Sequence, residues 1–180
     1  MCQECLVEVW AGSCSASTGL KGEWIQLPVE PAALNARLHE IDPAAAEWSC
    51  FDWSSNKMPA VAKQISDFAD PRAVNEALQP LTEWPASDWI DEVDAVVGYN
   101  GCSVAEALAV VEDGRVIRLP VETMSPRDVG EYVADETGIF DKAEKAGIAP
   151  YYIDFEAIGR DYLIEACIVE TQAGIFELLE

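Results

Sequence analysis

Residues 73–114 contain no Lys, Arg or His, yet they carry nine carboxylates, and any fold of this chain must accommodate their mutual repulsion. The nine are Glu76, Glu83, Asp88, Asp91, Glu92, Asp94, Glu106, Glu112 and Asp113. Over the whole chain 33 Asp and Glu stand against 11 Lys and Arg, which gives a formal net charge of -22. Self-repulsion on this scale destabilises a compact state and affects what the surface can bind. A reason for retaining so much charge is therefore the first question that the sequence poses.

The apolar content indicates a folded acidic protein and not a solvating tail. Hydrophobic residues make up 50% of the 180 residues, with six Trp, five Tyr and five Phe, whereas disordered acidic tails are poor in both classes. No apolar run approaches the roughly 18–20 residues of a membrane span, and the first residues lack the basic and apolar regions of a signal peptide. The six cysteines have no framework spacing, which favours reduced thiols in the cytoplasm. Such a surface repels nucleic acid and anionic lipid, and it attracts cations or basic partners.

The pattern of strand and helix signals predicts an α+β protein of three small domains in series. The first domain, residues 1–57, is predicted to combine a β-sheet with one helix. A helix begins at Pro31, at a position where proline is tolerated, and continues to about Ile41. Strands are expected near residues 6–10, 24–27 and 47–53, with a loop of small residues at 11–19.

The second domain, residues 58–114, is predicted to be helical and acidic. Val61, Ile65 and Phe68 have the spacing of one helical face. Ser87 is predicted to cap a helix that Gly98 ends. The other helix boundaries are expected at Asp70 with Pro71, at Ser103 and at Gly114.

The third domain, residues 115–180, is predicted to mix helices and strands. Residues 116–119 read as extended, and a helix is expected to start at Ser125-Pro126 and to run to about Glu136. Asp154 is predicted to cap another helix through about Asp161. A hairpin around Gly174 is expected to pair residues 167–169 with residues 175–178.

The sequence offers little support for catalysis or for a cofactor. The single histidine, His39, follows no nucleophile motif, and a structural or surface role is the better reading. No glycine-rich phosphate loop or calcium loop is present. Cys2 and Cys5 form one C-x-x-C, but a structural zinc ion needs four ligands, and no second pair completes the set. We therefore expect no enzyme, no cofactor and no specific metal site, with inert thiols at the start of a strand.

Two predicted helices place carboxylates on the face opposite their apolar residues. After Ser87, the apolar arc is formed by Trp89, Ile90, Val93, Val96 and Val97, and the opposite arc by Asp88, Asp91, Glu92 and Asp94. After Ser125, Val129, Tyr132 and Val133 share the inner face, and Asp128, Glu131 and Asp135 form an outer stripe. Like charges three or four positions apart cost roughly 0.2–0.5 kcal/mol each. Their rise of about 4.5–6 Å is comparable in scale with the phosphate spacing of about 3.4 Å along a nucleic-acid strand.

Three interpretations of the charge remain open on these grounds alone. The acids can be solvated faces of an ordinary or salt-adapted protein. They can form a binding module for a basic partner, or they can imitate DNA. For comparison, 22 net charges correspond to roughly 37 Å of duplex.

Several segments resemble conserved stretches of the ArdA-type antirestriction proteins. Residues 125–140, SPRDVGEYVADETGIF, resemble that family's S-x-x-D-x-x-x-x-x-x-x-D/E-T-G stretch. Residues 151–161, YYIDFEAIGRD, are similar to its Y-x-D-Y/F-E-A-x-x-R-D segment, which is the most specific match. Residues 100–114, NGCSVAEALAVVEDG, look like its G-G-D-x-x-E-A-x-x-x-L-E helix, and residues 22–25, GEWI, like its G-x-W-I/L strand. The similar segments occur in the family's order over nearly the whole chain.

The resemblance implies an elongated three-domain protein that imitates B-form DNA. Such proteins are generally dimeric and travel on mobile genetic elements. They occupy the DNA-binding groove of type I restriction–modification enzymes, as stoichiometric inhibitors and not as catalysts. The alternative is an acidic regulator that binds another basic, DNA-binding host protein. In either case we expect the partner-binding residues to be Asp88, Asp91, Glu92, Asp94, Glu106, Glu112, Asp113, Asp128, Glu131, Asp135 and Glu136.

Overall fold

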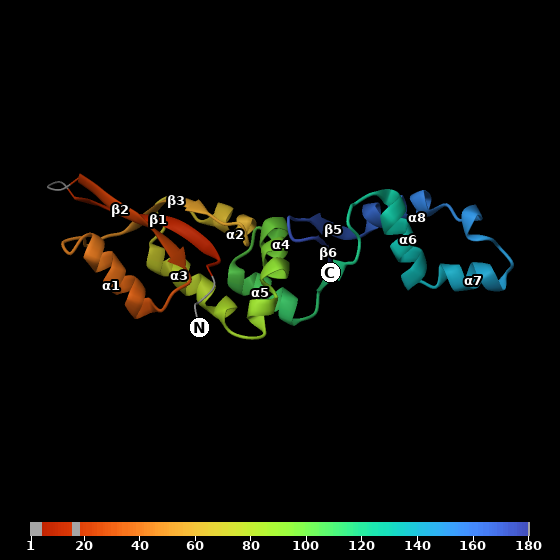
Figure 1. The fold of residues 1–180 in the computed structure, drawn as a ribbon, viewed down its shortest axis with the longest axis horizontal. Coiled ribbons are helices and arrows are strands. Elements are labelled where there is room, and N and C mark those ends of the chain that lie inside the picture. The colour runs from red at the N-terminus through yellow and green to blue at the C-terminus, as the bar shows by residue number, and fades with distance from the viewer. Residues whose placement is uncertain (1–4, 16–18, 180) are drawn as a thin grey trace. The chain divides into compact units, whose positions relative to one another are not determined.

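The computed structural model describes residues 5–15 and 19–179, and the chain divides into two compact units. Unit 1 comprises Met1–Val111 and unit 2 comprises Glu112–Glu180. Each unit combines helices with a small antiparallel sheet, so the predicted α+β class is confirmed (Figure 1). The finer division into domains at residues 1–57, 58–114 and 115–180 stays a prediction.

Unit 1 is built on a three-stranded sheet with the order β2-β1-β3. Its strands are β1 (Val7–Ser15), β2 (Gly19–Leu27) and β3 (Ser49–Ser54). Alternate residues of β1, among them Val7, Val9 and Ala11, are buried and form the core face of the sheet. Strands β1 and β2 are each nine residues long, so their hairpin is longer than the predicted strands near residues 6–10 and 24–27.

The loop predicted at residues 11–19 is wrong, because the glycines there belong to strands. Ala11 to Ser15 continue β1, and Gly19 begins β2, while residues 16–18 lie outside the described part of the chain. A Cβ on Gly12 would lie 2.7 Å from the Trp10 ring, and one on Gly22 would lie 2.5 Å from it. The Trp10 ring thus covers both positions, and a close approach, not a turn, explains these glycines.

Two helices cover the core face of this sheet, as the ribbon shows (Figure 1). Helix α1 (Pro31–Ile41) begins at the proline that predicted it and buries Leu34 and Leu38. Helix α3 (Pro71–Leu78) begins after Asp70, whose carboxylate accepts a hydrogen bond from Arg72 N. Two further helices, α2 (Pro59–Gln64) and α4 (Ile90–Asn100), pack against each other, and α5 (Val104–Glu112) follows. Short 3-10 helices lie at Gln79–Thr82 and Ala86–Asp88.

Both predicted ends of the helix at residues 87–98 are wrong. Helix α4 begins at Ile90 with Trp89 at the N-cap, and it ends at Asn100 with Gly101 at the C-cap in a left-handed conformation, φ 65°. Gly98 lies inside the helix, where an added Cβ would be 3.1 Å from the Cβ of Ala60 on α2. Gly98 allows close contact between α4 and α2. Gly101 terminates the helix, because it adopts the left-handed conformation that a C-cap glycine provides.

Phe68 does not lie on a helical face with Val61 and Ile65, contrary to the prediction. Helix α2 ends at Gln64, and Phe68 is exposed with a φ of 68°. Its backbone N–H donates to Cys50 O at 3.0 Å, so this segment runs alongside β3. A left-handed backbone costs a residue with a bulky side chain about 1–2 kcal/mol, and the contact with β3 holds it in place.

Unit 2 contains a second sheet with the order β4-β6-β5. Its strands are β4 (Val116–Leu119), β5 (Cys167–Glu170) and β6 (Ile175–Leu178). The predicted hairpin is confirmed, since Cys167 pairs with Leu178 and Glu170 with Ile175. The helices are α6 (Pro126–Glu136), α7 (Ile139–Lys145) and α8 (Phe155–Glu165), with a 3-10 helix at Pro150–Tyr152. Ser125 and Asp154 cap α6 and α8 as predicted, whereas α7 was not predicted and α8 runs four residues beyond Asp161.

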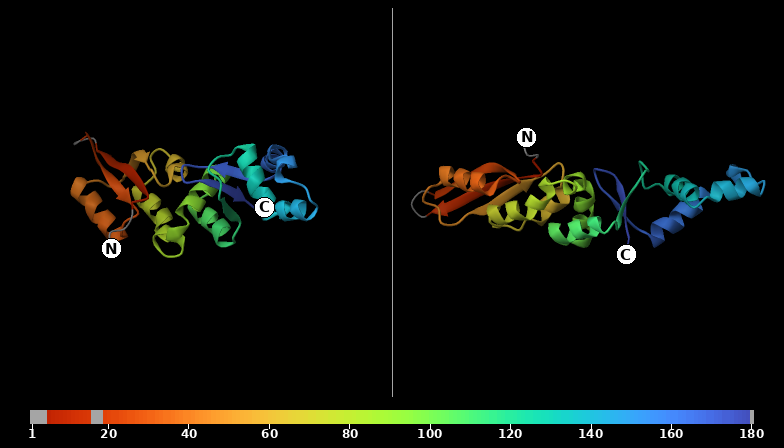
Figure 2. Two further views of the ribbon diagram at one scale, coloured as in Figure 1. Left: turned by 45° about the vertical axis from the view of Figure 1, so that its right-hand side comes forward. Right: turned by 90° about the horizontal axis from the view of Figure 1, so that it is seen from below.

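Helices α6 and α8 lie side by side (Figure 2), and their backbones are in direct contact at two glycines. A Cβ on Gly130 would lie 1.9 Å from Phe155 O, and one on Gly159 would lie 1.7 Å from Pro126 O. No side chain can be accommodated at either position without separation of the helices. The pair of glycines therefore fixes the position of α6 in unit 2.

We predict that Gly159→Ala destabilises unit 2 by about 3 kcal/mol or more, because the methyl group would collide with backbone atoms that cannot move aside. Chemical unfolding followed by circular dichroism measures the change. Arg160→Ala, at the exposed neighbouring position of α8, is the control and should change stability by less than about 0.5 kcal/mol. Equal stability of the Gly159 variant and the control would contradict the close helix contact.

Candidate protein-binding surface

The structure places ten of the eleven predicted contact residues at least partly on the surface. Asp91 and Glu92, in the first turn of α4, are half-buried. The other eight are exposed: Asp88, Glu106, Glu112, Asp113, Asp128, Glu131, Asp135 and Glu136. The exception is Asp94.

The outer-face position predicted for Asp94 is wrong, because this side chain is only 4% exposed. Its carboxylate accepts hydrogen bonds from Ala60 N at 3.0 Å and from Val61 N at 2.9 Å. These donors belong to the first turn of α2, so Asp94 caps a helix that packs beside its own. Burial raises the pKa of the Asp94 carboxyl, although the two backbone bonds oppose the shift. Asp94 therefore serves the packing of unit 1 and is not available to a partner.

Glu106 and Ser103 form a capping box at the start of α5. The Glu106 carboxylate accepts from Ser103 N at 2.9 Å and from Ser103 Oγ at 2.7 Å, and Ser103 Oγ accepts from Glu106 N at 3.3 Å. These bonds lower the pKa of the Glu106 carboxyl, with the backbone donor as the largest cause. Glu106 is thus a structural residue that also carries a fixed surface charge.

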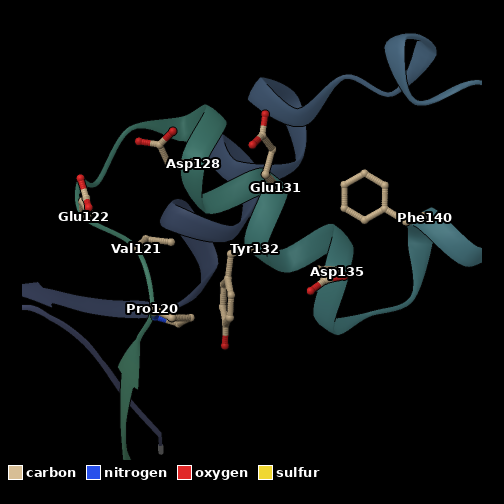
Figure 3. A pocket seen from close by; sticks show the side chains of 8 residues that line it. All are labelled: Pro120, Val121, Glu122, Asp128, Glu131, Tyr132, Asp135 and Phe140. Atoms are coloured by element: carbon tan, nitrogen blue, oxygen red, sulfur yellow. The ribbon is translucent and has the colours of Figure 1, made fainter.

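Four carboxylates surround one open pocket of about 590 Å³ in unit 2. Figure 3 shows the side chains that line it, which come from the segment after β4, from α6 and from the first turn of α7. The lining residues are Pro120, Val121, Glu122, Asp128, Glu131, Tyr132, Asp135 and Phe140. We call Glu122, Asp128, Glu131 and Asp135 the pocket carboxylates.

Asp128 remains ionised at the mouth of this pocket. Its carboxylate accepts from Thr123 Oγ1 at 2.6 Å, and the hydroxyls of Thr123 and Ser125 lower the pKa of the Asp128 carboxyl. Glu131 is paired on its outer side with Arg127 at 3.0 Å, an exposed contact worth at most about 1 kcal/mol. Among the described residues that line the pocket, none is basic. The lining therefore carries four carboxylates, of which Glu131 is paired with Arg127.

The pocket carboxylates match the chemistry of an arginine or lysine side chain. Carboxylates accept the N–H groups of both cations, and arginine can bind two oxygens at once. Tyr132 and Phe140 add aromatic surface beside the charges. Desolvation, followed by the charges of Glu136 and Glu177, raises the pKa of the Tyr132 hydroxyl, so it remains a neutral donor.

Helical spacing predicted that three of the four pocket carboxylates lie together, and the fourth was not predicted. Asp128, Glu131 and Asp135 share the outer stripe of α6, as the helical spacing predicted. Glu122 comes from an irregular segment, whose path no periodicity reveals. The one local signal is that Glu122 lies three residues before Ser125, the N-cap of α6, and so must lie close to the start of that helix.

His39 and the cysteines were the other candidates for chemistry in the sequence. His39 is exposed on the last turn of α1. Over the described ranges, no three His, Cys, Asp or Glu side chains converge as they would around a metal ion. Cys5 is a part-buried free thiol, and Cys2, its partner in the C-x-x-C motif, lies outside the described residues. The described helices also include none with the length and apolar character that a membrane span requires.

A comparison with protein families gives one match that covers most of the chain. A family described as antirestriction protein (ArdA) matches residues 16–177. No curated protein matches the chain significantly.

We predict that Asp94→Ala destabilises unit 1 by about 2–4 kcal/mol, because the N–H groups of Ala60 and Val61 would lose their acceptor in a buried site. The control is Asp88→Ala, which removes the same charge from an exposed position and should cost less than about 0.5 kcal/mol. Thermal and urea unfolding of both variants measure the difference. If Asp88→Ala proves as harmful as Asp94→Ala, the assignment of Asp94 as a structural cap fails.

Proposed function

The chain belongs to the ArdA family of antirestriction proteins, and we propose that it protects DNA by imitating the double helix. In this proposal it occupies the DNA-binding groove of a type I restriction–modification enzyme. Its carboxylates contact the Lys and Arg side chains that otherwise hold phosphates. It acts as a stoichiometric competitor and not as a catalyst.

The observation that carries the proposal is the set of pocket carboxylates, which surround one open cavity without a basic lining residue. Asp128, Glu131 and Asp135 are separated by three and four positions, which corresponds to rises of about 4.5 and 6 Å along α6. Phosphate groups follow one another at a similar scale along a DNA strand. A cationic groove that fits phosphates can therefore contact these acids in succession.

The placement of acids at helix ends also favours a role in binding. Asp135 and Glu136 lie in the last turn of α6, and that turn contains no basic residue. Glu112 likewise ends α5. Negative charge near a helix C-terminus opposes the helix dipole and costs about 0.3–1 kcal/mol. Because these acids destabilise their own helices, a role in binding a basic partner gives a reason for their presence.

The contact surface in this proposal comprises the exposed and half-buried acids of both units. Unit 1 contributes Asp88, Asp91, Glu92 and Glu106, and unit 2 contributes Glu112, Asp113, Glu136 and the pocket carboxylates. A homodimer, as the resemblance implies, would double the number of carboxylates that one enzyme groove can contact. The protein would act in the cytoplasm, where restriction enzymes meet incoming DNA, and would be encoded on a mobile element that benefits from the protection.

We predict that the purified protein displaces duplex DNA from a type I methyltransferase, and that the quadruple variant E122Q/D128N/E131Q/D135N does so less well. A surface ion pair contributes up to about 1 kcal/mol, so loss of four should raise the inhibition constant roughly 10- to 100-fold. Each single substitution should change it less than about fivefold, because the charge is distributed. Fluorescence anisotropy of labelled duplex measures the displacement, and affinity should fall steeply with salt.

The matched control removes four exposed acids that lie outside the proposed surface, in the variant E30Q/E47Q/E144Q/E170Q. It has the same net charge as the pocket variant, and we expect less than about a threefold change in the inhibition constant. Equal losses in the two variants would mean that net charge alone is responsible. Failure of the unmodified protein to displace DNA at low salt would contradict the proposal and favour another basic host protein as the partner.

A further inference from the structure

The outer face of the sheet in unit 1 carries a row of four aromatic side chains. Trp24 on β2 is directly opposite Trp10 on β1. The Trp10 ring meets Phe51 on β3 edge to face, with centroids 5.6 Å apart and planes at 73°. Phe51 in turn meets Phe68, with centroids 5.6 Å apart and planes at 81°. The row follows the strand order β2-β1-β3 across the sheet, and we call these residues the aromatic row.

Three of the four residues in the aromatic row are exposed and Trp10 is half-buried, although such residues normally fill a core. Trp24 is 47% exposed, Phe51 38% and Phe68 68%. Leu20, whose register partner Cys14 is on the same face as Trp10, is 54% exposed. Helices α1 and α3 pack on the opposite face of the sheet, where Val7, Val9 and Ala11 are buried. Contiguous apolar surface of this kind is typical of interaction sites.

The fold holds Phe68 in this row in an unfavourable backbone conformation. Its φ of 68° suits Gly or Asn far better than a residue with a large side chain. Two backbone bonds fix the segment against β3, Phe68 N to Cys50 O at 3.0 Å and Cys50 N to Ala69 O at 2.7 Å. The ring gains only an edge contact with Phe51 and remains mostly in solvent. Folding alone gives little reason for a phenylalanine here.

The charges on this face of the sheet are negative. Glu8 lies on the same face as Trp10 because it is two residues before Trp10 in β1. Asp52 lies on this face because it pairs with Trp10 across β1 and β3. Within the described parts of the three strands, no Lys or Arg occupies a position on this face. A second copy of this chain, a nucleic acid or an anionic membrane would therefore meet like charge. A basic protein would meet opposite charge.

We propose that the aromatic row is a second contact surface, which binds an arginine-bearing segment of the basic protein partner. A guanidinium group can stack on an aromatic ring and at the same time donate to a neighbouring carboxylate, which a lysine ammonium does less well. The row offers both elements, because Asp52 is directly opposite Trp10 in the sheet. That the segment belongs to the restriction enzyme rests on the proposed function. The preference for arginine does not.

The direct test is a titration of the protein with two peptides of equal charge. One contains seven Arg separated by Gly, and the other contains seven Lys in the same arrangement. At about 0.3 M salt, which screens long-range attraction, the Arg peptide should bind at least about fivefold more tightly. Amide chemical shifts of residues 8–26 and 49–69 and tryptophan fluorescence report where it binds. Equal affinity of the two peptides, or shifts confined to other segments, would overturn the proposal.

Two variants locate the binding, and one matched control removes an exposed tryptophan elsewhere. Trp24→Ala and Phe68→Gly should each abolish at least half of the Arg preference, and glycine at position 68 is compatible with the positive φ. Trp84→Ala, which removes a side chain that is 81% exposed outside the sheet, should leave the preference unchanged. An unchanged preference in Phe68→Gly overturns the proposal even if Trp24→Ala fails to fold.

The same variants separate this inference from the proposed function. If they displace DNA from the methyltransferase as well as the unmodified protein does, the aromatic row does not contact the enzyme. If the unmodified protein fails to displace DNA yet prefers the Arg peptide, the proposed function fails and the arginine-binding surface stands.

Discussion

Hydrogen bonds from N–H groups at the starts of helices stabilise several carboxylates of a chain that has few basic residues. Asp70 and Asp154 cap the helices that follow them, and Asp94 caps α2 from a neighbouring helix. Glu106 closes a capping box on α5. The partial positive charge at a helix N-terminus stabilises each of these carboxylates, and of the four Asp70 also forms an ion pair, with Arg72. The fold can therefore be stable with 11 Lys and Arg against 33 Asp and Glu.

This use of N–H donors divides the acids into two groups with different consequences. Asp94 is buried and hydrogen-bonded within unit 1, so it does not contribute to a binding surface. The described residues that line the pocket include no basic residue, and Arg127, which pairs with Glu131 at an exposed position, lies outside the lining. The support of the pocket carboxylates comes from packing, since the contact of Gly130 and Gly159 holds α6 against α8 at backbone distance. A rigid helix loses little conformational entropy when a partner binds to it.

Local signals were predictable from the sequence, and signals that depend on a neighbouring element were not. Ser125 and Asp154 could be identified as caps because a cap bonds to N–H groups two or three residues away. Asp94 was misplaced because helical spacing treats α4 in isolation, whereas the start of α2 lies against it. The prediction of a helix end at Gly98 is wrong because the contact of Gly98 with Ala60 depends on a second helix, α2. In the pocket, α6 spacing predicted Asp128, Glu131 and Asp135, but the irregular segment before α6 gave no warning of Glu122.

Competition with DNA places a physical demand on an inhibitor that carboxylates alone do not meet. A carboxylate stripe and a phosphate backbone attract the same cations and lose affinity with salt in the same way, so neither has an intrinsic advantage. Electrostatic attraction mainly raises the association rate, whereas close-packed contacts mainly lower the dissociation rate. An aromatic row that stacks on arginine adds contacts of the second kind, which the exterior of a duplex does not offer. On the proposed function, the acids of this protein would direct it to the enzyme, and Trp24 and Phe68 would help it to remain there when DNA arrives.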